Sequence, residues 1–361
     1  MLPLLCAFSA SFLVTLWIVR SAFHVRFSHD HDQSGPQKFH VRPVPRIGGL
    51  GIVLGVAAGF AALALRGADG RFATTLMACA MPVFLTGMTE DITKNVSPRR
   101  RLAAAALSAA FAAFAMDGVI ARTDLPGVDW LVASRIGSIL LAVFVVAGFA
   151  NAVNIIDGFN GLAAMCVVIM LICIAYVAFQ VGDVEIGWLA LAGVGAVLGF
   201  FVWNFPAGLV FLGDGGAYFL GFYVGELAIL LVHRNGRVSP MFALLLGIYP
   251  VFETVFSIYR RRVVRGRPVG MPDGAHLHSL IYRRLLRWAA GERTARELTR
   301  RNSMTSPYLW VLAMLSGVPA VMWWENSLVL GGFIVLFAIT YISLYRRIVR
   351  FKIPRFLRLS R

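Results

Sequence analysis

Apolar residues dominate this chain in long runs, and short polar stretches separate one run from the next. A run of about 20 apolar residues is long enough for a helix to cross a membrane. The pattern predicts an all-α, polytopic integral membrane protein with eleven spanning helices, or ten if one short, glycine-rich run does not cross. The expected spans are Leu2–Val19, Gly48–Leu65, Ala73–Gly87, Leu102–Ala115, Ile136–Val153, Gly161–Val181, Ile186–Trp203, Ala217–Val232, Met241–Ile258, Tyr308–Met322 and Ser327–Tyr345.

The composition excludes a soluble protein of this length. Of the 361 residues, 58% are hydrophobic and 14% charged, and the mean hydropathy is +0.74. The first run lacks a basic flank and a small-residue cleavage site, so we expect a retained helix instead of a signal peptide. All four cysteines fall within apolar runs, which argues against a disulfide framework or a thiolate metal site.

The basic residues lie mainly on one side of the predicted topology. With eleven spans the loops alternate between the two sides, and 28 of the 34 Lys and Arg residues fall on one of them. Because basic loops stay in the cytoplasm, we expect the N-terminus outside, the C-terminus inside and a location in the inner (plasma) membrane. The net charge of +16 then forms a basic face beside anionic membrane lipids. These charges flank helix ends, so nucleic acid is not an expected partner.

Acidic residues gather in loops on this same side, and the loops of Asp157 and Asp214 contain no Lys or Arg. The four clusters are Glu90 with Asp91, then Asp157, then Asp214, and Asp273 with His276 and His278. Carboxylates beside Arg, Lys and His suit phosphate groups and a divalent metal, and hard oxygen ligands select Mg²⁺ or Mn²⁺. The alternative for each acid is an ion pair that only orients its own loop. Four clusters on one face favour a site at the cytoplasmic membrane surface.

Spacing within the loops supports a polar site. Asp91 and Lys94 are three apart, so on a helix they share a face and place a cation beside an acid. Asn151, Asn154 and Asp157 follow at three-residue steps and form one polar stripe at a helix end. The glycines of "DGFNG" and "GDGG" let the backbone approach a ligand closely, or else serve helix capping and tight packing.

Three further features are weaker signals. His276 and His278 point together from an extended loop, but they lack a nearby third nitrogen or sulfur ligand for a metal. Lys38 and Arg46 belong to "KFHVRPVPRIGG", a stiff basic segment whose alternative role is ordinary membrane anchoring. Glu226 lies inside a span, where an acid is a functional candidate, but a single one can simply bond a neighbouring helix. We therefore leave Glu226 outside the site.

The order of the motifs resembles a known family. "PRIGG", "EDITK", "NAVNIIDGFNGLA", "WNFPAGLVFLGDGG" and "DGAHLH" stand on alternate loops, and the resemblance covers residues 38–284 by motif and the rest by topology. The chain looks like the polyprenyl-phosphate N-acetylhexosamine-1-phosphate transferases of glycosyltransferase family 4. The resemblance implies that undecaprenyl phosphate attacks the β-phosphorus of a UDP-N-acetyl sugar and releases UMP. This reaction would start the assembly of O-antigen, capsule or another envelope polysaccharide.

The resemblance also implies roles for individual residues. Asp214 would bind Mg²⁺ (or Mn²⁺) at the diphosphate, with Asn154 or, failing it, Asp157 as the second contact. Asp91 would act on the lipid phosphate as base or orienter. The residues expected to take part in catalysis are Asp91, Asp157, Asp214, His276 and His278. The residues expected to bind substrate are Lys38, Arg46, Lys94, Asn151, Asn160 and Asn204.

Three departures from the family pattern set this chain apart. Glu90 precedes Asp91 where the family has two Asp residues, Asn160 stands where many members have Asp, and Ser279 stands where a further His is common. Together they indicate a subgroup with an altered sugar preference or, as the alternative, a weakened enzyme.

We expect a single multi-span transferase domain over residues 1–345, with a long cytoplasmic loop at 260–307, and a basic tail at 346–361. A secondary transporter is an alternative, but it would place ionisable residues near the midplane of paired repeats. A non-catalytic scaffold is another, but it would lack matched acids on alternate loops. The sequence leaves open the sugar, the pathway, a covalent intermediate and the oligomeric state, although a homodimer is common for enzymes of this type.

Overall fold

The computed structural model describes residues 1–22, 44–67, 69–264, 266, 274–286 and 294–350. This part of the chain is built from helices without a β-strand, which confirms the expected all-α fold. Lys38 lies outside the described residues, as do the tail from residue 351 onward and parts of the 260–307 loop.

Each of the eleven expected spans lies within a helix of the structure, with at most one residue beyond either end of that helix, except that the ninth is divided between α9 and α10. The α-helices are α1 (Leu2–Ala22), α2 (Gly48–Ala64), α3 (Gly70–Thr93), α4 (Pro98–Ala115), α5 (Arg135–Ile156), α6 (Leu162–Gln180), α7 (Val184–Asn204), α8 (Gly213–Arg234), α9 (Pro240–Leu246), α10 (Ile248–Tyr259), α11 (Leu277–Leu280), α12 (Ala295–Met322) and α13 (Ser327–Val349). Three further short helical segments are the 3₁₀ helix η1 (Asp129–Val132) and the π-helices η2 (Arg260–Val264) and η3 (Ile281–Leu285).

Many of these helices can cross a membrane. Among the described residues, eight helices are long and apolar enough, and the bent pair formed by α9 and α10 would make a ninth. The protein is therefore a multi-pass membrane protein. α2 is apolar but only 17 residues long, and α4 begins with a proline and three arginines, so the total of eleven spans stays a prediction.

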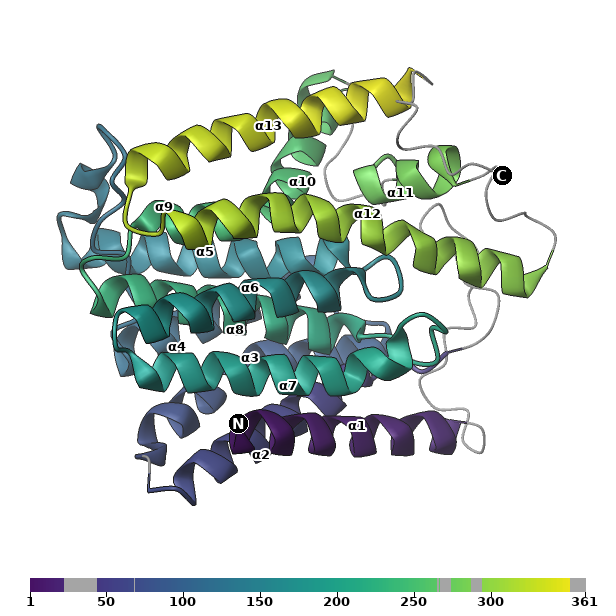
Figure 1. The fold of residues 1–361 in the computed structure, drawn as a ribbon, viewed down its shortest axis with the longest axis horizontal. Helices are drawn as coiled ribbons and strands as arrows, with labels where there is room; N and C mark the ends of the chain where they lie inside the picture. The colour runs from purple at the N-terminus through teal and green to yellow at the C-terminus, as the bar shows by residue number, and fades with distance from the viewer. Residues whose placement is uncertain (23–43, 68, 265, 267–273, 287–293, 351–361) are drawn as a thin grey trace.

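Local sequence explains where several helices begin and bend. Ser97, Ser134 and Thr294 precede α4, α5 and α12, and each side chain accepts a backbone N–H of the first turn. Thr294 also forms a capping box with Glu297. At Gly247 the chain turns by 70° between α9 and the helix that follows. In Figure 1, α10 consequently rises steeply across the direction of the other helices.

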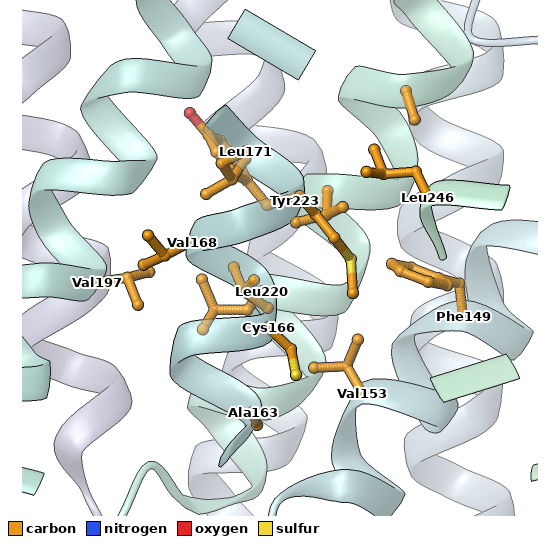
Figure 2. Close-up of a cluster of buried hydrophobic side chains, with 14 of the residues drawn as sticks. Phe149, Val153, Ala163, Cys166, Val168, Leu171, Val197, Leu220, Tyr223 and Leu246 are labelled. Atoms are coloured by element: carbon orange, nitrogen blue, oxygen red, sulfur yellow. The ribbon is translucent and has the colours of Figure 1, made fainter. Parts of the chain in front are cut away.

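α8 is the centre of the bundle. In an apolar 18-residue stretch of α8, 94% of the residues are buried, against 17% in the corresponding stretch of α13. α8 packs against α2, α3 and α5, and further against α4 and α6. The core around it is drawn in Figure 2, which labels Phe149, Val153, Ala163, Cys166, Val168, Leu171, Val197, Leu220, Tyr223 and Leu246. Neighbours on several helices therefore fix the position of the first turn of α8.

The loops that carry the predicted site residues lie at one end of the bundle, on the right in Figure 1. α3, α5 and α7 end there, α4, α8 and α12 begin there, and α11 lies beside them. An alternating helical topology places every second loop on the same side. The sequence prediction that the acids share one face is therefore met by the fold.

Candidate active site

Asp91 ties the end of α3 to the start of α8. The side chain is 1% exposed, and its two oxygens accept the backbone N–H groups of Asp214 and Gly215, each at 2.8 Å. The first N–H groups of a helix have no partner within that helix, so Asp91 caps α8 from a different helix. Gly213 turns the chain into α8 with a φ of +74°, and a Cβ there would lie 2.5 Å from Asp91. The contact fixes where α8 begins.

Asp214 is held by side chains from two other helices. Arg101 of α4 forms an ion pair with its Oδ2, and Asn154 of α5 donates to its Oδ1 at 2.7 Å. The Arg101 guanidinium also lies over the ring of Tyr218, 5.8 Å from the centroid. Tyr218 in turn donates to Asn151 at 2.9 Å. The predicted stripe of asparagines on α5 therefore faces α8 and positions its acid.

Asp157 follows α5 in the loop that leads to α6. Removal from water raises the pKa of Asp157 to about 7, against the opposing charge of Arg46. The carboxylates of Asp214 and Asp91 raise this pKa further. The three acids are thus close enough to repel one another, and a cation at this end of the bundle would relieve that repulsion.

The histidine motif reaches the same end of the bundle through α11. His276 precedes α11 and His278 lies in it, and their rings stack with centroids 5.1 Å apart. The ring of His278 meets Phe159 edge-on at 5.5 Å. Its Nε2 lies 3.6 Å from the place where a Cβ on Gly158 would stand. Because Gly158 follows Asp157 in the chain, the structure brings the histidines next to the acids.

Asn160 and Asn204 hold loops of the protein together. Asn204 accepts the backbone N–H of Gly161 at 2.6 Å and donates to the carbonyl of Val210 at 2.7 Å. The backbone N–H of Asn160 donates to Asn302 of α12 at 2.8 Å. Both asparagines are buried and contact neighbouring segments, and a direct contact of either with a nucleotide stays a prediction.

The remaining residues of the first acidic motif take separate positions. Lys94 ends α3 in the left-handed conformation, with a φ of 57°, and is exposed, whereas Asp91 is buried. The helix face that their spacing predicts is therefore absent, because the helix stops before Lys94. Arg46 Nε lies 3.9 Å from Asp91 Oδ1. Glu90 accepts the backbone N–H of Val96 at 2.6 Å and closes the turn to α4, so Asp91 alone of the acid pair faces α8.

Sequence reasoning missed three residues of this region. The sequence marks Arg101 only as one more basic residue near a helix end, and 113 positions separate it from its partner Asp214. Glu253 lies 3.0 Å from Nδ1 of His276 and is an acid inside an apolar run, which was the available signal. Asn302 carries no such signal, because a polar residue just before an apolar span is ordinary.

The oxygen ligands of this end fit a divalent metal that also binds substrate. Within the described ranges, no group of three or more His, Cys, Asp and Glu side chains is placed to hold a metal ion. Mg²⁺ usually needs only one or two carboxylates beside waters and substrate phosphates. The amide nitrogen of Asn154 donates to Asp214 Oδ1 at 2.7 Å, so the carboxylate of Asp214 and the amide oxygen of Asn154 would be such a small set of oxygen ligands next to mutually repelling acids.

Comparison with known proteins agrees with the motifs. The profile of glycosyl transferase family 4 matches residues 73–232. The chain is 32% identical to the probable undecaprenyl-phosphate N-acetylglucosaminyl 1-phosphate transferase of Bacillus subtilis. The similarity extends over 260 residues and covers 68% of this chain and 68% of the relative. It is 28% identical over 257 residues to the undecaprenyl-phosphate alpha-N-acetylglucosaminyl 1-phosphate transferase of Thermotoga maritima, covering 71% of this chain and 74% of the relative. It is also 28% identical over 287 residues to the phospho-N-acetylmuramoyl-pentapeptide-transferase of Geobacillus kaustophilus, covering 73% of this chain and 86% of the relative.

The family match runs from α3 to α8 and so contains all three acids of the site. The Bacillus subtilis relative extends the similarity over two thirds of both chains. Fold, motif order and similarity agree, and this chain belongs to glycosyl transferase family 4, a family of membrane-bound sugar-phosphate transferases.

Proposed function

We propose that the protein transfers an N-acetylhexosamine-1-phosphate from a UDP-sugar to undecaprenyl phosphate and releases UMP. The observation that carries the proposal is the convergence of Asp91, Asp157 and Asp214 at one end of the bundle, beside the histidine motif. The names of the Bacillus subtilis and Thermotoga maritima relatives specify N-acetylglucosamine, so UDP-N-acetylglucosamine is the first donor to test. The product would begin an envelope polysaccharide such as O-antigen or capsule.

The proposed reaction exchanges one phosphorus–oxygen bond for another. An oxygen of the lipid phosphate bonds to the β-phosphorus of the UDP-sugar, and the bond from that phosphorus to the bridging oxygen breaks, so UMP leaves with that oxygen. The lipid phosphate is already anionic at neutral pH, so the protein must mainly position two anions and neutralise their charge. A bound Mg²⁺ would neutralise the diphosphate, held by Asp214 and Asn154 or, failing the latter, Asp157.

We infer different roles for two of the acids from their contacts. Both carboxylate oxygens of Asp91 accept hydrogen bonds from backbone N–H groups of α8, which favours an orienting role for Asp91 over the role of a proton acceptor. Asp214 is paired with Arg101, which keeps a carboxylate in place beside the incoming phosphates. The histidine pair would hold a phosphate when its rings are protonated.

We also propose that the site faces the cytoplasm, with the N-terminus outside and the C-terminus inside the inner membrane. The support is the concentration of arginines at the site end, where α1, α10 and α13 finish and α4 begins. Homodimer formation stays an expectation.

UMP release by the purified protein tests the proposal, with undecaprenyl phosphate, Mg²⁺ and a panel of UDP-N-acetylhexosamines. Release should require both the lipid phosphate and the metal. Asp214→Asn should lower the rate about 100-fold or more, the scale of losing one electrostatic contact to a transferred group. Glu325→Gln, an exposed acid paired with Arg237 at the opposite end, should keep the wild-type rate. Folded protein that neither releases UMP nor binds any UDP-sugar would favour the transporter or scaffold alternatives.

A further inference from the structure

Glu253 is a buried acid of α10 that none of the sequence motifs includes. It is 1% exposed, its Oε1 lies 3.0 Å from Nδ1 of His276, and the same oxygen accepts the backbone N–H of Leu277 at 2.9 Å. A carboxylate oxygen can only accept, so Nδ1 of His276 carries the hydrogen in this contact. A single oxygen atom therefore fixes both the ring of His276 and the start of α11.

Charged and titratable groups from three elements surround this pair. Tyr249 and Arg260 lie on α10 and at its end, His278 on α11 and Tyr341 on α13. Arg260 donates to the carbonyl of the residue before His276 at 2.7 Å. Tyrosine is neutral at pH 7, because its ordinary pKa is about 10. Glu253 is therefore the acid of this set, and it supplies a negative charge to the two histidines.

The contact has a consequence for the other ring nitrogen of His276. Because Nδ1 is hydrogen-bonded to Glu253, Nε2 is the ring nitrogen that remains for a ligand. A partner that fixes one ring nitrogen usually also selects the tautomer of the neutral ring. The ring also stacks on His278, whose Nε2 lies beside Gly158. The orientation that Glu253 imposes is thus passed toward the acids of the site.

We propose that Glu253 is a positioning residue of the transferase site: it holds the ring of His276 in one orientation, and its negative charge stabilises the protonated ring, whose Nε2 donates to a substrate phosphate. This inference rests on the proposed function and deepens it, because it states what prepares the histidine motif to bind an anion. The competing explanation is that Glu253 only caps α11. In that case its loss would lower stability and leave the pH dependence of catalysis unchanged.

Three variants separate the two explanations. Glu253→Gln keeps an oxygen for both hydrogen bonds and removes the charge, whereas Glu253→Asp keeps the charge on a shorter side chain. Glu226→Gln is the matched control, because Glu226 is also fully buried but lies against Gly118. We expect kcat of Glu253→Gln to fall about 10- to 100-fold. The alkaline limb of its kcat/KM profile should move to lower pH, while Glu253→Asp and Glu226→Gln keep the wild-type limb.

Nuclear magnetic resonance of the full chain, with ¹⁵N-labelled histidine and a His276→Gln variant for assignment, follows the ring without substrate. The neutral ring of His276 should carry its hydrogen on Nδ1, and its titration midpoint should lie at lower pH in Glu253→Gln than in wild type, because the neighbouring negative charge is lost. Equal midpoints would overturn the positioning role. A wild-type hydrogen on Nε2 alone would also overturn it, and that measurement does not need a folded Glu253→Gln protein. A wild-type protein that releases no UMP while the midpoint still shifts would defeat the proposed function and leave the positioning intact.

Discussion

Gly87 provides a sharp test of how the site is assembled, because it lies where α3 touches the first turn of α8. A Cβ on Gly87 would stand 2.6 Å from Cα of Gly215, 2.7 Å from its nitrogen and 2.8 Å from the carbonyl carbon of Asp214. All three are backbone atoms, so no side-chain rotation can make room. Gly87→Ala must therefore separate α3 from α8.

The size of that separation follows from the contacts. Ordinary contact for a Cβ begins at 3.4 Å, so the helices must move apart by about 0.8 Å. Asp91 lies one turn farther along α3, and its hydrogen bonds to α8, now 2.8 Å, would lengthen to about 3.6 Å, beyond the range of a hydrogen bond. Overpacking lowers the free energy of unfolding by about 1 to 3 kcal/mol, and each lost hydrogen bond lowers it by about 1 kcal/mol more. A displacement near 1 Å at a reacting centre costs about 100-fold in rate.

We therefore expect Gly87→Ala to release UMP about 100-fold more slowly than wild type and to melt at a lower temperature. The assay is UMP release together with thermal unfolding in the same detergent. Gly148→Ala on α5 is the matched control, because a Cβ there meets nothing within 4 Å. It should keep full activity and gain about 0.5 to 1 kcal/mol of stability, as alanine does over glycine inside a helix. A Gly87→Ala protein as active as Gly148→Ala would falsify the argument that Asp91 and α8 must stay in contact.

Three other predictions concern the surroundings of this contact. Arg101→Ala should remove the ion pair of Asp214 and lower kcat. It should lower the apparent affinity for Mg²⁺ less than Asp214→Asn does, and a metal titration of UMP release measures this difference. Asn204→Ala should destabilise the protein by about 1 to 3 kcal/mol, because it leaves the buried N–H of Gly161 without its partner, and chemical unfolding tests this. Asp157→Asn should raise the melting temperature more at pH 8.5 than at pH 5; a gain that is equal at both would contradict the raised pKa.

The sign of the Asp157 prediction follows from linkage. Its pKa in the folded protein is about 7, above the ordinary value near 4, so the folded state holds the proton more tightly than the unfolded state. Stability is then lost as pH rises between these two values. Removing the carboxylate abolishes that loss, so the benefit of Asp157→Asn grows from about pH 4 to about pH 7 and is complete above about pH 7.

The local pattern of the chain determined the class of protein and the end of the bundle at which the candidate site residues gather. Apolar runs report helices long enough for a membrane, and alternating loops place Asp91, Asp157 and Asp214 on one side whatever the packing. The spacing of Asn151 and Asn154 likewise indicated one polar face, because residues three apart on a helix point in similar directions. Each of these inferences needs only neighbours in the sequence.

Contacts between distant segments were decided by the tertiary structure alone. Asp91 lies 123 positions from the backbone it caps, and Asn160 lies 142 positions from Asn302. Helical spacing carries information over three or four residues, so it predicted a shared face for Asp91 and Lys94 where the helix in fact stops. The hydrogen-bond partners of Asp91, and of Glu253 beside the histidines, are fixed by how α8, α10 and α11 pack, because buried polar groups take whichever partners the packed helices bring within reach.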